Sequence, residues 1–480
     1  MSAPADPSNG VAKRGVALAA VVAVACVAQF MVVLDSSIVN VALPSMKSGL
    51  GLSTGAQQWV VNGYLVTFGG LLLCASRAGD LFGRRRVFLI GLAVFSAASL
   101  AGGLAQDGWM LLAARAVQGA GAAALAPSSL SLITAGHSDP SRRRRAMTWW
   151  GVAASSAGAA GIVAGGLLTS VSWRWVMLVN VPIGVGLLVA GLTCLAPTVT
   201  AHRRSSVDVP GAITVTLSAA AIVYGVSAVP DAGWGAPRVV VALIAGVVLL
   251  AAFAAIERRG AEPLIPLGIF SSATVRMGNI LTLCLGVVLT APLFFLSLYL
   301  QQVEGQSALR TGLSLLPMVA VISVGVLLSQ RLIPTIGARR LLVIGAIGAA
   351  LGLAWLGQLP AHDGYVTHVL LPTVLVGAGT SLTMMPAIVA ATSGIDPRDA
   401  GIASGLITMC RQLGAALGLA VLVTVATTVT DHIGSGGNAA VVDGYRVAFY
   451  VLAVVSLVTA ALVPLLREPP RTHPARKEVP

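Results

Sequence analysis

One loop motif occurs twice in the chain, each time between apolar segments. The first copy reads Arg77-Ala78-Gly79-Asp80-Leu81-Phe82-Gly83-Arg84-Arg85-Arg86-Val87-Phe88-Leu89-Ile90-Gly91. The second reads Arg331-Leu332-Ile333-Pro334-Thr335-Ile336-Gly337-Ala338-Arg339-Arg340-Leu341-Leu342-Val343-Ile344-Gly345. Five positions match at a constant offset of 254 residues: Arg77/Arg331, Gly83/Gly337, Arg85/Arg339, Arg86/Arg340 and Gly91/Gly345. This indicates an internal duplication.

The composition places both copies in a membrane protein. Of the 480 residues, 56% are hydrophobic and only 10% are charged, whereas soluble domains average about 25% charged residues. A helix needs roughly 20 apolar residues to cross a bilayer, and fourteen segments of the chain meet this requirement. They lie at 16–42, 57–76, 86–105, 109–135, 146–170, 175–195, 209–230, 237–256, 275–300, 312–333, 340–359, 367–392, 401–428 and 444–466.

The duplication and the spans together predict an all-α integral membrane fold. Two six-helix bundles related by a parallel repeat, with two helices inserted between them, are typical of alternating-access transporters. The expected parts are a cytoplasmic N-terminal tail 1–15, an N-terminal bundle 16–195, a cytoplasmic linker 196–208, two inserted helices 209–256, a second cytoplasmic linker 257–274, a C-terminal bundle 275–466 and a cytoplasmic tail 467–480.

Basic residues fall mainly on one side of this arrangement. If the N-terminus is cytoplasmic, 23 of the 30 Lys and Arg lie in inside segments, five lie in outside loops, and Arg115 and Arg411 lie within spans. Cytoplasmic loops carry an excess of Lys and Arg, so both termini are expected in the cytoplasm. The net charge of +13 therefore reflects topology and does not indicate nucleic-acid binding. The five cysteines are isolated in apolar runs and form no metal-binding or disulfide pattern.

The first span contains one carboxylate, in the stretch Leu34-Asp35-Ser36-Ser37-Ile38-Val39-Asn40-Val41-Ala42-Leu43-Pro44. Asp35 lies roughly 13 Å below the outer end of its span, and Arg115 roughly 9 Å below the outer end of the fourth span. These depths are similar, so we expect the two side chains to meet. An ionisable residue inside a membrane span is costly and marks a functional site by default. Either Asp35 exchanges a proton and Arg115 tunes it, or the pair is permanently ionised and only holds two helices together.

Several motifs together resemble the fourteen-span drug:proton antiporters of the major facilitator superfamily, the EmrB/QacA type. They are Leu34–Pro44, Asp80–Arg85, Arg115–Gly121, Trp173–Trp175, Asn180–Pro182 and Ser404–Gly414. The resemblance implies the major facilitator fold, proton coupling at Asp35, and a cytoplasmic gate formed by Asp80, Gly83, Arg84 and Arg85. The alternative for these arginines is a role in topology alone.

The chain departs from the family pattern at two positions. Ser76 stands where the loop motif usually has Gly, and Ile162 stands where the fifth span of the antiporters usually has Pro. A small-residue face that lets helices approach closely is still expected in the fifth span. It consists of Gly158, Gly161, Gly165 and Gly166.

Polar residues in or near the spans are candidates for a substrate pocket, because lipid-facing polar groups are costly. The candidates are Asn40, Gln58, Asn62, Gln118, Tyr299, Gln301 and Arg411. Local hydrogen bonding between helices is the alternative for several of them. Arg411 is expected either to bind an anionic or carbonyl-bearing substrate or to serve as a structural cation whose long stem is buried. No Walker-type glycine loop is present.

These features predict a proton-coupled efflux antiporter that exports hydrophobic drugs or antibiotics, cationic or neutral, by alternating access. It is expected in a bacterial cell membrane, as a monomer in the lipid bilayer, with no cofactor or metal and with the proton gradient as its energy source. Two other hypotheses stay open. The Ile162 departure leaves room for a proton symporter that imports a small organic solute. A membrane enzyme or scaffold is the other, although we find no paired catalytic acids.

Overall fold

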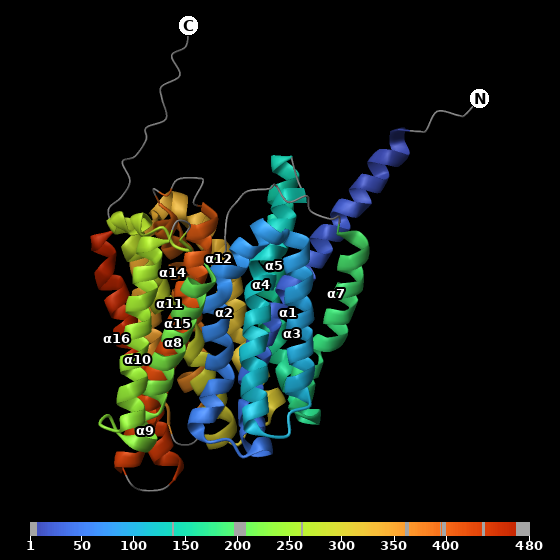
Figure 1. The fold of residues 1–480 in the computed structure, drawn as a ribbon. Coiled ribbons are helices and arrows are strands. Elements are labelled where there is room, and N and C mark those ends of the chain that lie inside the picture. Colours follow the sequence, from blue (N-terminus) through green and yellow to red (C-terminus); the bar gives the residue numbers. More distant parts are fainter. Residues whose placement is uncertain are drawn as a thin grey trace, which may run out of the picture.

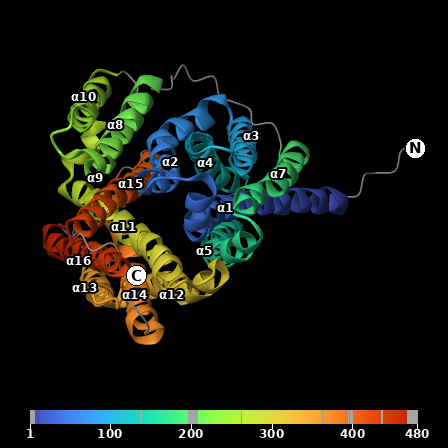
Figure 2. The same cartoon turned by 90° about the horizontal axis from the view of Figure 1, so that it is seen from below.

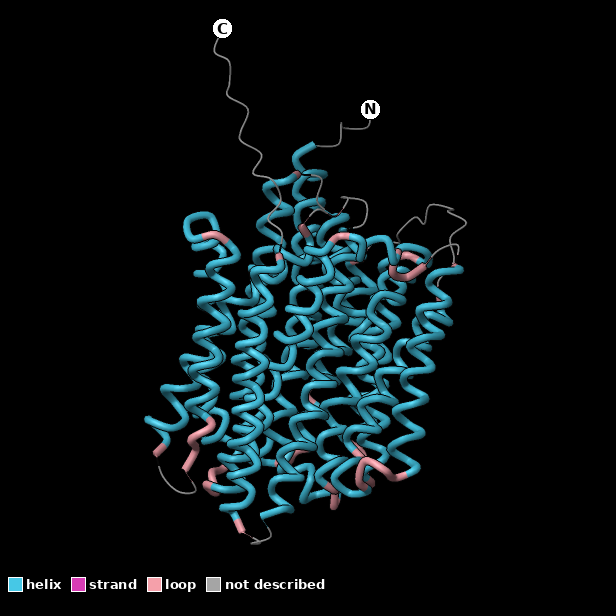
Figure 3. Tube along the Cα trace, turned by 90° about the vertical axis from the view of Figure 1, so that its left-hand side faces the viewer, coloured by secondary structure: helices cyan, strands magenta, loops and turns pink. Residues whose placement is uncertain are grey.

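A computed structural model of the chain describes residues 7–136, 139–195, 208–260, 263–360, 364–393, 395, 400–433 and 437–466. These residues form helices and short connections, with no strand among them (Figures 1 and 3). The predicted linker segment 196–207 and tail 467–480, and the predicted cytoplasmic residues Arg203, Arg204 and Arg398, lie outside the described residues.

The helices fall into three groups along the chain. The N-terminal half comprises α1 (Pro7–Leu50), α2 (Thr54–Phe82), α3 (Arg84–Gly103), α4 (Gly108–Gly136), α5 (Pro140–Val171), α6 (Arg174–Leu178) and α7 (Asn180–Cys194). The inserted group comprises α8 (Val209–Ser227), α9 (Val229–Ala232) and α10 (Pro237–Arg259). The C-terminal half comprises η1 (Leu267–Ser271), α11 (Ala273–Leu298), η2 (Tyr299–Val303), α12 (Ala308–Ile336), α13 (Ala338–Leu356), η3 (Tyr365–Leu370), α14 (Leu371–Thr392), α15 (Ala400–Ile433), α16 (Asn438–Leu462) and η4 (Val463–Leu465).

Fourteen segments of the described chain are helical, long and apolar enough to cross a membrane, which confirms the number expected from the sequence. The largest difference in bounds is at α1, which continues past Pro44 to Leu50. A proline within a helix leaves the carbonyl four residues earlier without its amide partner. That carbonyl belongs to Asn40, and the hydroxyl of Ser297 on α11 donates to it at 2.8 Å. The contact that the proline removes within α1 is thus replaced by a contact between the two halves.

The duplicated motif builds the same corner in each half. Gly83 joins α2 to α3 with φ +94°, and Gly337 joins α12 to α13 with φ +89°, a backbone region that favours glycine. Arg85 donates to the carbonyl of Leu192 near the end of α7 at 2.8 Å. Arg339 donates to the carbonyl of Pro464, just after α16, at 2.9 Å. In both halves this arginine therefore caps the last helix of its own bundle.

The two halves lie side by side, and the inserted helices pack against the seam between α2 and α15 (Figure 2). α8 contacts both halves. A Cβ at Gly70 of α2 would lie 2.3 Å from the hydroxyl of Thr216 on α8, and Thr424 of α15 donates to the carbonyl of Val226 on α8 at 2.9 Å. The seam between α5 and α12 lies away from this inserted group (Figure 2).

The halves are in contact at several levels of the bundle. We call the side at which α1 begins and α16 ends the terminal side, and the opposite side the distal side (Figure 1). At the distal side Gln301 donates to the carbonyl of Val41 on α1 at 2.9 Å, beside the Ser297 contact. Toward the terminal side, Ser323 of α12 still donates to the carbonyl of Ser155 on α5 at 3.2 Å. A Cβ at Gly151, one turn further along α5, would have nothing within 4 Å. The face of α5 that carries Gly151 thus has no close neighbour at this level, whereas Ala146 and Trp150 still pack with α1 and α4.

Candidate functional site

Asp35 lies at the centre of a hydrogen-bonded network inside the N-terminal half. Its side chain is fully buried, with 0% exposed. Oδ2 accepts from Arg115 Nη1 of α4 at 2.6 Å. Oδ1 accepts from Gln118 Nε2 of α4 at 2.8 Å and from Asn180 Nδ2 of α7 at 2.9 Å. Hydrogen bonds to an ionised partner are roughly twice as strong as neutral ones, so this carboxylate on α1 ties together three helices.

The guanidinium of Arg115 is held from several sides. Besides Asp35, its Nη1 donates to Gln118 Oε1 at 2.7 Å, and its Nε donates to the carbonyl of Val60 on α2 at 2.9 Å. The ring of Tyr64 lies against it, with 4.5 Å from Cζ to the ring centroid, an arrangement that stabilises a buried cation. The contact expected from the similar depths of Asp35 and Arg115 is therefore present, and it is part of a larger network.

Close helix packing fixes the position of this network. A Cβ at Gly119 of α4 would lie 2.4 Å from the carbonyl oxygen of Tyr64, so α4 and α2 are in backbone contact. On the other face of α1, a Cβ at Gly161 would lie 2.9 Å from Leu34 O, and one at Gly165 would lie 2.8 Å from Ile38 O. α1 is thus fixed between α5 and α4, with Asp35 turned toward α4.

The four glycines expected to form one face of α5 divide between two neighbours. Gly161 and Gly165 meet α1, as described above. A Cβ at Gly158 would lie 3.3 Å from a methyl of Val319, and one at Gly166 would lie 2.8 Å from the carbonyl oxygen of Ala308. Both of these contacts are with α12, so half of this glycine set lies at the seam between the two halves.

The residues expected to form a gate make their contacts within the N-terminal half. Arg84 forms an ion pair with Asp80 at 3.3 Å and donates to the carbonyl of Ser131 on α4 at 3.3 Å. Arg85 caps α7, and Gly83 supplies the positive-φ turn. Among the described residues, neither Asp80 nor these two arginines has a hydrogen bond or ion pair to the C-terminal half.

The residues expected to line one substrate pocket lie in different places. Gln118 belongs to the Asp35 network. Gln58 accepts from Ser227 of α8 at 3.4 Å. Tyr299 donates to the carbonyl of Pro360 at 2.8 Å. The amide of Asn40 donates to Ser36 O of its own helix at 3.0 Å, and Gln301 donates to Val41 O. Both side-chain polar atoms of Asn62 are buried without a hydrogen-bond partner.

Two further members of the network were not among the site residues expected from the sequence. Asn180 donates directly to Asp35 and is 0% exposed. Ser99 of α3 accepts from Gln118 Nε2 at 2.7 Å. The available signal for Asn180 was the motif Asn180–Pro182, in which a polar residue opens an apolar segment. A serine within a helix gave no such signal, because its hydroxyl can satisfy a carbonyl of its own helix, as Ser99 does with Phe95 O at 2.8 Å.

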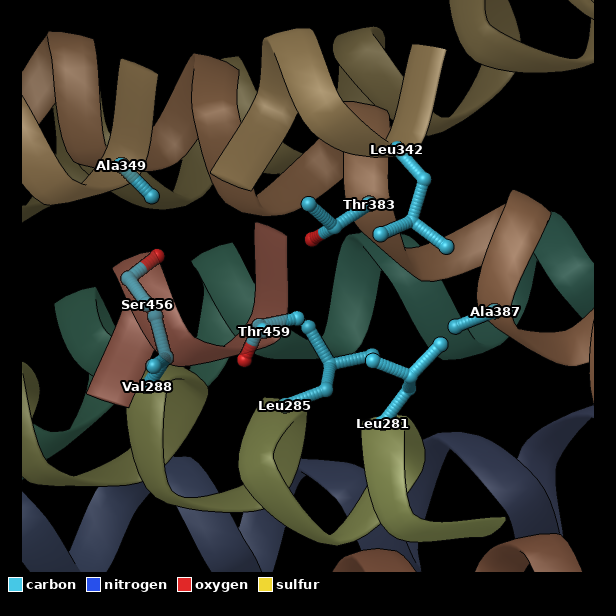
Figure 4. A pocket seen from close by; sticks show the side chains of 9 residues that line it. All are labelled: Leu281, Leu285, Val288, Leu342, Ala349, Thr383, Ala387, Ser456 and Thr459. Carbon is cyan, nitrogen blue, oxygen red and sulfur yellow. The ribbon is translucent and has the colours of Figure 1, made fainter. Parts of the chain in front are cut away.

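The interior of the C-terminal half is apolar by comparison. It holds a void of about 10 Å³ between α11, α13, α14 and α16, lined by six aliphatic side chains and three hydroxyls (Figure 4). Each hydroxyl donates to a helix carbonyl, as Ser456 does to Ala346 O at 2.8 Å. Within the described chain, no group of three His, Cys, Asp or Glu side chains could hold a metal ion. The hydrogen-bonded network around Asp35, by contrast, lies within the N-terminal half.

The fold and this network define a multi-pass membrane protein with two related six-span halves and a buried Asp35–Arg115 ion pair in the N-terminal half. The model of the Major Facilitator Superfamily matches residues 25–419. The chain belongs to this superfamily.

Curated relatives cover nearly the whole chain. A cephamycin export protein of Amycolatopsis lactamdurans is 41% identical over 98% of this chain and 96% of its own length. A puromycin resistance protein of Streptomyces alboniger is 40% identical over 91% of this chain and 88% of its own length. Both comparisons extend through the inserted helices and the C-terminal half.

Solved structures share the fold at low identity. An inward-facing bacterial homologue of the human lysosomal transporter Spinster superimposes with a TM-score of 0.67 at 15% identity, covering 95% of this chain and 99% of that one. A D-xylose–proton symporter superimposes with a TM-score of 0.63 at 14% identity, covering 91% of this chain and 96% of that one. At this identity the likeness establishes the fold alone.

Proposed function

We propose that this protein exports antibiotic-like small molecules across the cell membrane in exchange for protons. The relatives named for antibiotic export and resistance support the export of such compounds. Their identity extends over most of the chain, and the described helices include no large domain outside the spans. These features support transport by alternating access, in which the substrate crosses the membrane without being chemically changed.

The observation that carries the proton coupling is the Asp35 network. The fully buried Asp35 side chain accepts hydrogen bonds from three side-chain donors, and one of these is the Arg115 guanidinium. Protonation removes the charge that Arg115, Gln118 and Asn180 all bind, so it weakens the link of α1 to α4 and α7 at once. Loss or gain of one proton thus changes how α1 is held, which is the property that proton-driven rocking requires.

We assign the coupling to conformation and not to direct competition at Asp35. Competition would need a cationic substrate to contact the carboxylate, but Asp35 is 0% exposed and its two oxygens are already bound by protein donors. The network must open before either a proton or a substrate reaches it. Conformational coupling also accommodates neutral and anionic substrates.

We assign the terminal side to the cytoplasm, following the excess of basic residues there. Arg84, Arg85 and Arg86 lie at that side, as do the four arginines Arg142 to Arg145 at the start of α5. The distal contacts of Ser297 and Gln301 with α1 then close the outer side. We expect a monomer with no cofactor, and the proton gradient supplies the energy.

Transport in liposomes tests this proposal. Purified protein is reconstituted with a pH-sensitive dye inside, and a panel of antibiotics that includes puromycin and a cephalosporin is added, one drug at a time, to the face that corresponds to the cytoplasm. An exporter takes up the drug against its gradient when the lumen is acidic, and each drug molecule releases protons from the lumen. Uptake that occurs only when drug and proton move in the same direction would establish the symporter alternative. Drug movement that ignores an imposed pH gradient would refute the proton coupling.

A further inference from the structure

Arg411 is a membrane-embedded cation without a partner in the described part of the chain. It lies on α15, eleven residues after the helix begins at Ala400, or roughly 16 Å from the terminal side. Arg115 is bound by Asp35, and Arg446 pairs with Asp443 at 2.6 Å. The side chain of Arg411, by contrast, makes no hydrogen bond and no ion pair with any described residue. An unpaired charge at such a depth is costly and marks a functional position.

The backbone around Arg411 is fixed by close packing with α11. A Cβ at Gly286 would lie 2.0 Å from the carbonyl oxygen of Arg411, and a Cβ at Gly414 would lie 2.2 Å from the carbonyl oxygen of Leu283. α11 and α15 are therefore in backbone contact just distal to the Arg411 side chain. This contact holds the guanidinium on a rigid element and not on a loop.

A polar strip continues from Arg411 toward the terminal side. Ser404, Thr408 and Arg411 follow one another at helical spacing and so share a face of α15. Asn279 shares a face of α11 with Leu283 and Gly286, the residues that meet α15. Its Oδ1 is buried and has no hydrogen-bond partner.

Exposure changes along the Arg411 face of α15. Ser404 is exposed, whereas Ala415, one turn distal to Arg411, is buried. Asn279, on the neighbouring face of α11, stays buried. Arg411 lies where the change occurs.

We propose that Arg411 binds the carboxylate of the exported compound, and that Asn279 Oδ1 accepts from an N–H or O–H donor of the same compound. The inference rests on the proposed export function and narrows its substrates to acidic molecules with a donor near the acid. A guanidinium binds a carboxylate through two parallel hydrogen bonds. Asp35 does not supply this counter-charge, because it is bound by Arg115 in the other half. The charge of Arg411 thereby selects an anion on the terminal side.

Matched acid and ester probes test this inference. Binding of penicillin and cephalosporin acids, and of their methyl esters, is measured on the purified full-length protein by thermal shift and tryptophan fluorescence, and their uptake is measured in liposomes. We expect the wild type to prefer at least one acid over its ester. Arg411→Gln should weaken binding of that acid by about ten- to a hundredfold and leave the ester unchanged, while Arg411→Lys should keep part of the preference.

Arg258→Gln is the matched control, since it removes one exposed arginine at the end of α10 and should leave the preference intact. The inference is overturned if no acid in the panel binds the wild type more tightly than its ester. It is also overturned if Arg411→Gln weakens acid and ester equally, which indicates a structural role. A third contrary result is an effect seen only in phosphatidylglycerol and not in phosphatidylcholine vesicles, which indicates a lipid phosphate as the occupant. An acid that binds through Arg411 but is not transported would instead refute the export function.

Discussion

Replacing Asp35 with Asn tests the role of the buried network most directly. The substitution keeps the size of the side chain and removes its charge, so Arg115 is left as a buried cation without a counter-ion. Breaking a buried ion pair in this way costs about 3–5 kcal/mol. The new amide also places an NH₂ group where Oδ1 or Oδ2 accepted a hydrogen bond from Gln118, Asn180 or Arg115. We therefore expect a clear loss of stability together with the loss of proton exchange.

A second substitution separates these two effects. In the double variant Asp35→Asn, Arg115→Gln no charge remains unpaired, so the loss should fall to about 1–3 kcal/mol, the cost of imperfect neutral hydrogen bonds. The apparent melting temperature should then increase in the order single variant, double variant, wild type. Proton exchange should be absent from both variants, because neither has a group at position 35 that ionises.

The assay measures the number of protons released per drug molecule transported in liposomes, not the transport rate. This ratio is independent of how much active protein survives reconstitution. Asp231→Asn, in the short helix α9, removes an exposed carboxylate and serves as the control. A wild-type proton ratio in Asp35→Asn would refute the coupling role. A loss of stability no larger than that of the control would refute the energetic reasoning.

Three further predictions concern packing, the loop after α2 and pH. Gly161→Ala should destabilise the protein by about 1–3 kcal/mol, because its Cβ meets Leu34 O at 2.9 Å, whereas Gly151→Ala, with nothing within 4 Å, should not; thermal melting compares them. Asp80→Asn should change stability by only about 0.2–0.5 kcal/mol, as for i,i+4 pairs, yet reduce the initial rate of drug uptake; an unchanged rate would exclude a gating role. The backbone N–H of Ser141 donates to Asp139 and lowers the pKa of this carboxyl, so its cap stabilises α5 above the unfolded pKa of about 3.9 and is lost as the pH falls through the lower folded value. Amide exchange protection at Ser141 should therefore fall on strong acidification, and protection that persists at about pH 2 would contradict this account.

The arrangement of spans could be predicted from the sequence because membrane crossing depends on length and hydropathy, which are local. The repeated motif also gave a true structural equivalence, since Gly83 and Gly337 share a conformation and Arg85 and Arg339 cap corresponding helices. Depth along a helix follows from counting residues. This is why the contact between Asp35 and Arg115 could be expected from their positions in the sequence.

The rotation of each helix about its axis could not be predicted in the same way. Asn180 reaches Asp35 across 145 residues of sequence, and nothing local states which helix faces α1 at that depth. The residues predicted to line one pocket lie in different places for the same reason. A polar residue in a span needs a hydrogen-bond partner, but the sequence does not show on which helix that partner lies. The predicted end of the first span was wrong, because Pro44 does not end the helix. The carbonyl of Asn40, which loses its amide donor at Pro44, accepts a hydrogen bond from Ser297 of another helix instead.

α1 connects the buried Asp35 network to the contact between the halves, and this connection supports the proposed conformational coupling. Asp35 and Asn40 lie five residues apart on one continuous helix. Asp35 binds α1 to α4 and α7, while the carbonyl of Asn40, released by Pro44, binds α1 to Ser297 of the C-terminal half. In the proposed mechanism, a proton that loosens the first set of contacts frees α1 to tilt, and a tilt of α1 strains the second set at the distal side. Neutralising Asp35 can therefore open the distal contact although no substrate touches the carboxylate.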